Sequence, residues 1–144
     1  MFQDAAQYLI SLGLLFTTIS ILLSIYVYKR QMNAQLFLEF TKRYEEIMRT
    51  YPDEARALRL ESEGTVPPPS EELTVSVLRY LNLCSEEFYL WKNGYLSKQI
   101  WRIWENEMKR TVSSPLYTRE WETLKKEFDS YSEFADYIRR IQAG

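Results

Sequence analysis

Histidine is absent from the sequence, and Cys84 is the only cysteine. Histidine is the commonest general base near neutral pH and the commonest metal ligand, so histidine-dependent triads, Cys–His pairs and histidine zinc sites are excluded. A single cysteine cannot form an intrachain disulfide, which agrees with a reducing compartment. Cys84 lies on the apolar face of a predicted helix, where cysteine usually acts as a small hydrophobic residue. We therefore predict a protein without catalytic activity, cofactor or metal.

Glycine is also scarce, with four residues in a chain of 144. No stretch alternates apolar and polar residues over the length of a strand, whereas apolar residues recur at steps of three and four along most of the chain. The fold class is therefore predicted to be all-α. A glycine-rich phosphate-binding loop is missing from the sequence. With 18 basic against 20 acidic residues there is no positive excess to neutralise phosphates, so no nucleic-acid partner is expected.

Charge is missing from one long apolar run, which extends from Ala5 to Tyr28 and is followed at once by Lys29-Arg30. A helix of about 20 apolar residues matches the roughly 30 Å hydrocarbon core of a bilayer, and buried core helices are usually shorter. A secretory signal would have basic residues before the run and a small-residue cleavage site after it. An interfacial helix would have a charged face. The sequence therefore predicts one transmembrane helix within residues 1–28.

The basic residues predict the orientation of this helix, because all 18 of them lie after position 28. Four of these, Lys29, Arg30, Lys42 and Arg43, lie within about 15 residues of the predicted membrane exit, where positive charge favours the cytoplasmic side. We expect a single-pass protein of the inner membrane that contacts the lipid bilayer. Its N-terminus is predicted outside and its C-terminal domain in the cytoplasm.

Small residues share one face of the predicted span. They are Ala6, Gly13, Thr17, Ser20 and Ser24. Small side chains let two helix backbones approach closely in lipid, so this face predicts a homo-oligomer or pairing with another membrane protein. The alternative is that the serine and threonine hydroxyls bond only to carbonyls of their own helix, which bilayers tolerate.

Residues 29–50 contain no glycine or proline and repeat apolar residues at helical spacing, so they are predicted to continue the membrane helix as a stalk. A short dimeric coiled coil is an alternative for this stripe. Residues 51–144 are predicted to form a compact cytoplasmic domain of about four helices. Three consecutive prolines predict a loop at 61–69, since proline cannot enter a helix interior.

Within this domain, serines mark the predicted helix starts, and glycine marks one helix end. The starts are Ser70, Ser97, Ser114 before Pro115, and a capping box from Ser130 to Glu133; the end is Asn93-Gly94. The tryptophans and tyrosines after position 88 are expected mainly in the core, because each buried ring removes roughly 150–250 Å² from water.

Two adjacent carboxylates are the best candidates for a binding site. On a helical wheel Glu86 points away from the apolar face, whereas Glu87 lies at its edge, so the two do not form a chelating pair. Tyr89 and Tyr95 lie off the apolar face or in a turn, where they are expected to be exposed. The candidate pocket or partner contacts are Asn82, Glu86, Glu87, Tyr89 and Tyr95.

Residues 81–88 (LNLCSEEF), 93–96 (NGYL) and 100–104 (IWRIW), with Pro115, Trp121 and Phe128, form a recognisable pattern. It resembles a family of uncharacterised small bacterial single-pass membrane proteins with a cytoplasmic all-helical domain of unknown function. The similarity covers roughly residues 73–134 and the anchor. It implies the same architecture here and brings no activity with it.

Three functions follow as expectations. The first is a membrane-anchored helical interaction, scaffold or regulatory module that is not an enzyme and that self-associates. The second is a ligand-sensing or carboxylate-dependent enzymatic bundle, which requires a concave site with a partly buried carboxylate. The third is an oligomeric effector that perturbs the membrane.

Overall fold

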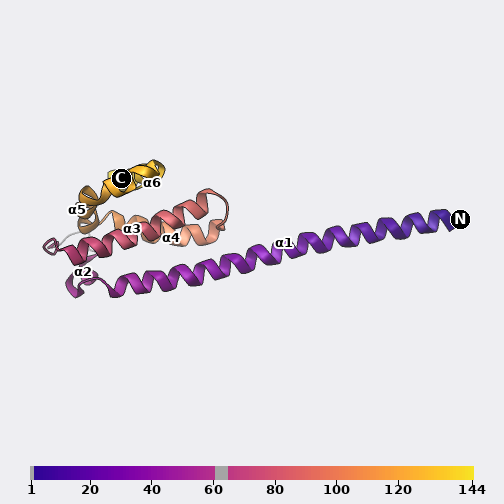
Figure 1. Cartoon of the computed structure of the whole chain (residues 1–144), viewed down its shortest axis with the longest axis horizontal. Coiled ribbons are helices and arrows are strands. Elements are labelled where there is room, and N and C mark those ends of the chain that lie inside the picture. Colours follow the sequence, from indigo (N-terminus) through magenta and orange to yellow (C-terminus); the bar gives the residue numbers. More distant parts are fainter. Residues whose placement is uncertain (1, 61–64) are drawn as a thin grey trace. The chain divides into compact units, whose positions relative to one another are not determined.

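The structure is a computed structural model that describes residues 2–60 and 65–144, and these ranges contain helices but no strand. In chain order the helices are α1 (Phe2–Arg49), α2 (Asp53–Leu58), α3 (Glu71–Lys92), α4 (Lys98–Val112), α5 (Pro115–Leu124), the 3₁₀ helix η1 (Lys125–Tyr131) and α6 (Ser132–Ala143) (Figure 1). The predicted all-α class is confirmed for this part of the chain. The chain divides into two compact units, and the boundary lies between Leu36 and Phe37.

The first unit is the N-terminal part of α1. It is long and apolar enough to cross a membrane, and its large apolar side chains are exposed along residues 8–28. The hydroxyls of the small-residue face donate hydrogen bonds to carbonyls one turn earlier in the same helix. Thr17 Oγ1 bonds to the Gly13 carbonyl at 2.9 Å, and Ser24 Oγ bonds to the Ser20 carbonyl at 2.8 Å. These bonds are the local arrangement that the sequence left open as an alternative.

The second unit begins at Phe37, inside the range predicted as a stalk. Phe40 is buried, and its ring stacks on Trp104 of α4 with 5.2 Å between centroids. One turn later, Tyr44 meets Tyr80 of α3 edge to face at 6.2 Å. From Phe37 onward the apolar stripe of α1 therefore packs on helices of its own chain, which is the contact that a coiled-coil partner would otherwise supply.

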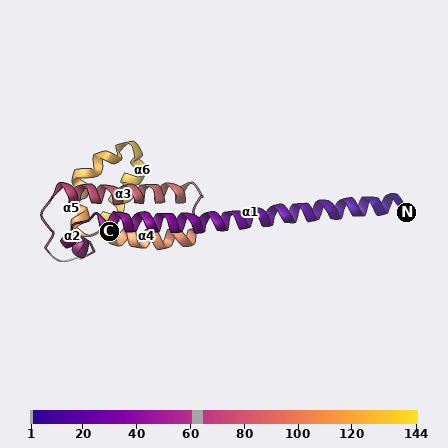
Figure 2. The same ribbon diagram turned by 60° about the horizontal axis from the view of Figure 1, so that its bottom comes forward.

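Helices α3 and α4 form an antiparallel pair (Figures 1 and 2). The predicted N-caps are confirmed, because Ser70 Oγ accepts a hydrogen bond from the Leu73 amide at 3.2 Å and Ser97 Oγ accepts one from the Ile100 amide at 3.3 Å. The turn between the helices contains Gly94 at φ 75°, a left-handed conformation that glycine adopts without a Cβ clash. Ser70 and Ser97 thus mark where the two helices begin, and Gly94 allows the turn between them.

The predicted capping box from Ser130 to Glu133 is wrong. Ser130 lies inside η1, and α6 begins at Ser132 after Tyr131, without a side-chain cap. The 3₁₀ segment buries Phe128 against Trp121 and Phe134, at centroid distances of 5.6 and 5.3 Å. Packing of this ring therefore fixes the α5–α6 connection, and the serine is not at a helix boundary.

Ser114 stands at the predicted boundary before Pro115, but its hydroxyl makes no cap. The Ser114 Oγ is buried without a hydrogen-bond partner among the described residues. The helix start is thus set by the backbone and by proline at the first position, whose fixed φ suits a helix.

The core of the second unit is rich in aromatic rings, as predicted. Phe88 of α3 lies at its centre and contacts rings from α4, η1 and α6. Trp101, Trp121 and Cys84 are all buried. Of the predicted loop 61–69, residues 61–64 lie outside the described residues, and residues 65–69 form no helix.

Candidate functional site

The predicted site residues fall into two places on the second unit. Asn82 and Glu86 line an open polar groove together with Arg43 and Arg79. Glu87 faces a different cavity, because neighbouring residues of a helix point about 100° apart. The structure therefore does not bring Asn82, Glu86 and Glu87 together in one pocket.

Glu86 is the partner of Arg43. The guanidinium donates two hydrogen bonds to this carboxylate, Nη1 to Oε2 at 2.5 Å and Nη2 to Oε1 at 2.8 Å. Such a bidentate pair joins α1 to α3 in a defined orientation. Both groups remain partly exposed, so the pair contributes little to stability and mainly sets the register of the two helices.

Tyr89 and Tyr95 are about half exposed, in agreement with their predicted positions off the apolar face. Neither of these two tyrosines lines the groove of Glu86 or the cavity of Glu87. They remain candidate contacts for a partner at the surface.

The Glu87 cavity lies where α1, α3 and α4 meet, and it has a volume of about 230 Å³. Its lining residues are Phe37, Phe40, Thr41, Tyr44, Tyr80, Glu87, Ile103, Trp104 and Glu107. Its walls are mostly aromatic, with the Phe37 and Trp104 rings nearly parallel at 6.1 Å. A mostly apolar cavity with a few polar groups is the usual composition of a small-molecule site.

Glu87 is the buried carboxyl group of this cavity, with 8% of the residue exposed. Burial raises its pKa to about 8; the nearby Arg43 guanidinium opposes the shift, and the Glu86 carboxylate adds to it. Among the described residues no hydrogen bond reaches its side chain. Near pH 7 the group is therefore mostly protonated, because burial removes most of the water that would solvate its charged form and no hydrogen bond among the described residues replaces that water.

Glu120 of α5 is another buried carboxylate in the same unit, and its oxygens accept hydrogen bonds. It accepts hydrogen bonds from the Thr74 hydroxyl at 2.8 Å and from Arg119 Nε and Nη2 at 3.0 and 2.7 Å. Arg119 also donates to the Pro67 carbonyl at 2.5 Å. This network joins α3, α5 and the proline segment, so Glu120 has a structural explanation that Glu87 lacks.

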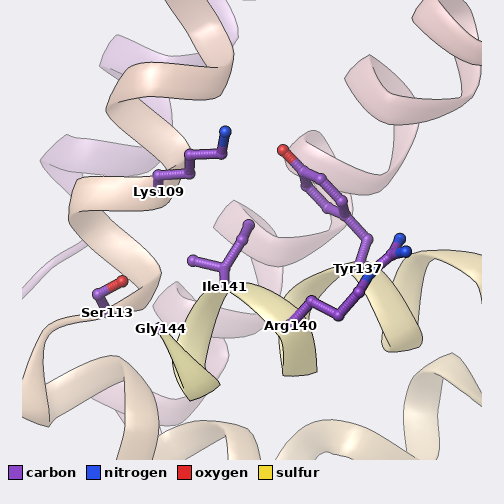
Figure 3. Close-up of a pocket in the computed structure, with 6 residues that line it drawn as sticks. All are labelled: Lys109, Ser113, Tyr137, Arg140, Ile141 and Gly144. Atoms are coloured by element: carbon purple, nitrogen blue, oxygen red, sulfur yellow. The ribbon is translucent and has the colours of Figure 1, made fainter.

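A second cavity, of about 380 Å³, lies between α4 and α6 (Figure 3). Lys109 and Tyr137 point toward each other across it. Both bind the same carboxylate, since Lys109 Nζ lies 2.9 Å from Glu105 Oε1 and the Tyr137 hydroxyl donates to that oxygen at 3.0 Å. Two of its polar groups are thus already paired within the protein, which makes this cavity a weaker candidate than the one at Glu87.

Metal binding has no assembled ligand set, because within residues 2–60 and 65–144 no three histidine, cysteine, aspartate or glutamate side chains come together. The carboxyl groups at the Glu87 cavity are those of Glu87 and Glu107. Glu107 is paired with Arg110, whose Nη2 lies 2.9 and 3.0 Å from its two oxygens. Glu87 is thus the carboxyl group that remains to contact an occupant of the cavity.

The sequence reasoning selected Glu87 but missed the aromatic residues that surround it. Phe40 and Tyr44 belong to the apolar stripe of residues 29–50. An apolar stripe on a helix outside the membrane must pack against something, and this was the one sequence signal that could have indicated the cavity. No family model, curated protein or solved structure matches the chain. The family resemblance of residues 73–134 accordingly stays a prediction.

Proposed function

We propose that this protein is a membrane-anchored, non-catalytic helical module that acts by binding, with the second unit in the cytoplasm and the N-terminus outside. The observation that carries the proposal is the exposed apolar surface of α1 between Ala5 and Tyr28. In a bilayer, each Leu, Ile, Phe or Val near the centre of such a helix favours insertion by roughly 0.3–0.6 kcal/mol. The basic flank after position 28 supports the orientation.

The anchor is tested by alkaline carbonate extraction of membranes that contain the full chain. We expect the wild-type protein to stay in the membrane pellet and to be released by detergent. Leu15→Arg with Ile19→Arg should move most of the chain out of the pellet, because an arginine near the centre of a span is unfavourable by roughly 2.5–3.5 kcal/mol. Leu38→Arg, at an exposed leucine outside the span, is the control and should stay pelleted. Recovery of wild-type protein in the wash would refute the anchor.

Self-association through the small-residue face is the partner interaction that we propose for the span. Gly13 supports it, because a side chain added there would meet nothing within 4 Å, so the face is open to a second helix. Small residues allow the close approach that stabilises helix pairs in lipid.

Crosslinking in membranes should therefore give a dimer or higher oligomer that Gly13→Leu reduces several-fold, as expected for a loss of roughly 1 kcal/mol of helix pairing. Thr18→Leu is the matched control, since it enlarges a neighbouring position away from this face. An oligomer ladder that is the same in both variants would remove the face from the proposal.

A second function, binding of a small ligand by the cytoplasmic unit, is favoured by one observation. The Glu87 cavity combines aromatic walls with a buried carboxyl group that has no hydrogen-bond partner among the described residues. A carboxyl group left in this state is unfavourable for folding, and such groups are often retained at binding sites. This function is compatible with the first, because a ligand could regulate a membrane-anchored module.

A further inference from the structure

The walls of the Glu87 cavity determine which ligands it could accept. Phe37 and Phe40 both stack on Trp104, at 6.1 and 5.2 Å between centroids, so one side of the cavity is a continuous aromatic surface. Tyr44 and Tyr80, which also line the cavity, stand edge to face with 6.2 Å between ring centroids. Aromatic faces carry negative charge density and attract organic cations within about 6 Å.

The cations close to the cavity are engaged elsewhere. Arg43 is held by both oxygens of Glu86, and its guanidinium carbon lies over the Phe40 ring, 5.1 Å from the ring centroid. Arg110 is paired with Glu107. The side chain of Glu87 therefore faces the cavity without a direct cationic partner among the described residues, so an ionisable carboxyl group lies beside aromatic walls.

We propose that this cavity binds a protonated organic amine, whose ammonium group donates a hydrogen bond to the ionised Glu87 carboxylate while its apolar body lies against Phe37 and Trp104. The proposal names the ligand class for the second function above and rests on it. An anion would be repelled by the nearby Glu86 and Glu107 carboxylates, and a neutral ligand would not pair with an ionised Glu87.

Proton linkage follows from the groups that face Glu87. These are Arg43 and Tyr44 from α1, Tyr80, Cys84 and Glu86 from α3, and Glu107 from α4. Burial raises the pKa of Tyr80 and of Cys84 well above their usual values, so both stay neutral near pH 7. The group that changes charge on binding is Glu87, whose pKa burial raises to about 8 in the unliganded protein. The neutral acid releases its proton to the buffer and becomes a carboxylate, and the ammonium cation then pairs with it.

The experiment is calorimetric titration of the full chain in dodecyl maltoside micelles with 2-phenylethylammonium, and with 2-phenylethanol as its neutral isostere. We expect the amine to bind more tightly than the alcohol and to release close to one proton at pH 7. Because Glu87 must ionise, affinity for the amine should be about fiftyfold weaker at pH 6 than at pH 8. Heats measured in two buffers of different ionisation enthalpy count the released protons.

Glu87→Gln should abolish both the preference for the amine and the proton release. Glu122→Gln, at an exposed carboxylate paired with Lys125, is the control and should change neither. Equal affinity for amine and alcohol in the wild-type protein would overturn the amine class and leave the ligand-binding function standing. Failure of both probes to bind would overturn the two together. If Glu107→Gln rather than Glu87→Gln removed the preference, the assignment to Glu87 would be wrong.

A lipid headgroup is a second source of the same ammonium chemistry. Phosphatidylethanolamine added to the micelles distinguishes it, with phosphatidylglycerol as the lipid control. Competition by phosphatidylethanolamine alone would assign the amine to a headgroup, whereas amine binding unaffected by either lipid would assign it to a free molecule. Equal competition by both lipids would mean that acyl chains fill the cavity, which would overturn the proposal.

Discussion

Glu87→Gln is expected to stabilise the second unit, by about 3–4 kcal/mol at pH 8 and by less than about 1 kcal/mol at pH 5. Burial raises the pKa of this carboxyl group from 4.5 to about 8 on folding. The folded state therefore binds more protons than the unfolded state between these values. Wild-type stability must fall as the pH rises through this window, and it levels off above pH 8. The neutral amide does not ionise and should remove this dependence.

Urea unfolding of the full chain in detergent micelles measures this effect. All four tryptophans, Trp91, Trp101, Trp104 and Trp121, lie after Phe37, so their fluorescence reports on the second unit. The control is Glu122→Gln, which should change stability by no more than about 0.5 kcal/mol, because an exposed ion pair contributes little. A Glu87→Gln variant that is less stable at pH 8, or as pH-dependent as the wild type, would mean that Glu87 is charged in the folded protein.

Local sequence signals predicted the elements of the fold well. Ser70 and Ser97 cap helices because their hydroxyls need only the amides three residues later. The burial of Cys84 and Trp101 followed from helical periodicity alone. Such features depend on residues within one or two turns of each other, so a single sequence is sufficient to locate them.

Features that depend on contacts between distant segments were not predictable in the same way. The periodicity of residues 29–50 showed that an apolar stripe existed, but not that Trp104 and Tyr80, far along the chain, would cover part of it. The helical wheel places Glu87 at the edge of an apolar face, but its burial depends on the packing of α1 against α3 and α4. The predicted capping box at Ser130 was wrong for a related reason, because the buried ring of Phe128 fixes the conformation of the backbone nearby.

Glu120→Ala is expected to destabilise the second unit by about 3 kcal/mol, the opposite sign to Glu87→Gln. Glu120 is 3% exposed and accepts hydrogen bonds from the Thr74 hydroxyl and from Arg119. Hydrogen bonds to a charged group contribute about 1.5–3 kcal/mol each, and removal of one partner leaves the others unsatisfied in the interior. The Arg119 side chain is one-third exposed and can partly regain water, which keeps the loss below the largest values for buried pairs.

Glu120→Gln separates charge from shape in this network, since an amide oxygen can still accept from Thr74 while the attraction to Arg119 is lost. We expect it to lose about half as much stability as Glu120→Ala in the same urea experiment at pH 7. Thr118→Ala, an exposed site on α5, is the control for helix effects and should be nearly neutral. Equal stability of Glu120→Ala and the wild type would show that water replaces these bonds without loss. The difference between the two buried glutamates would then no longer follow from their hydrogen bonds.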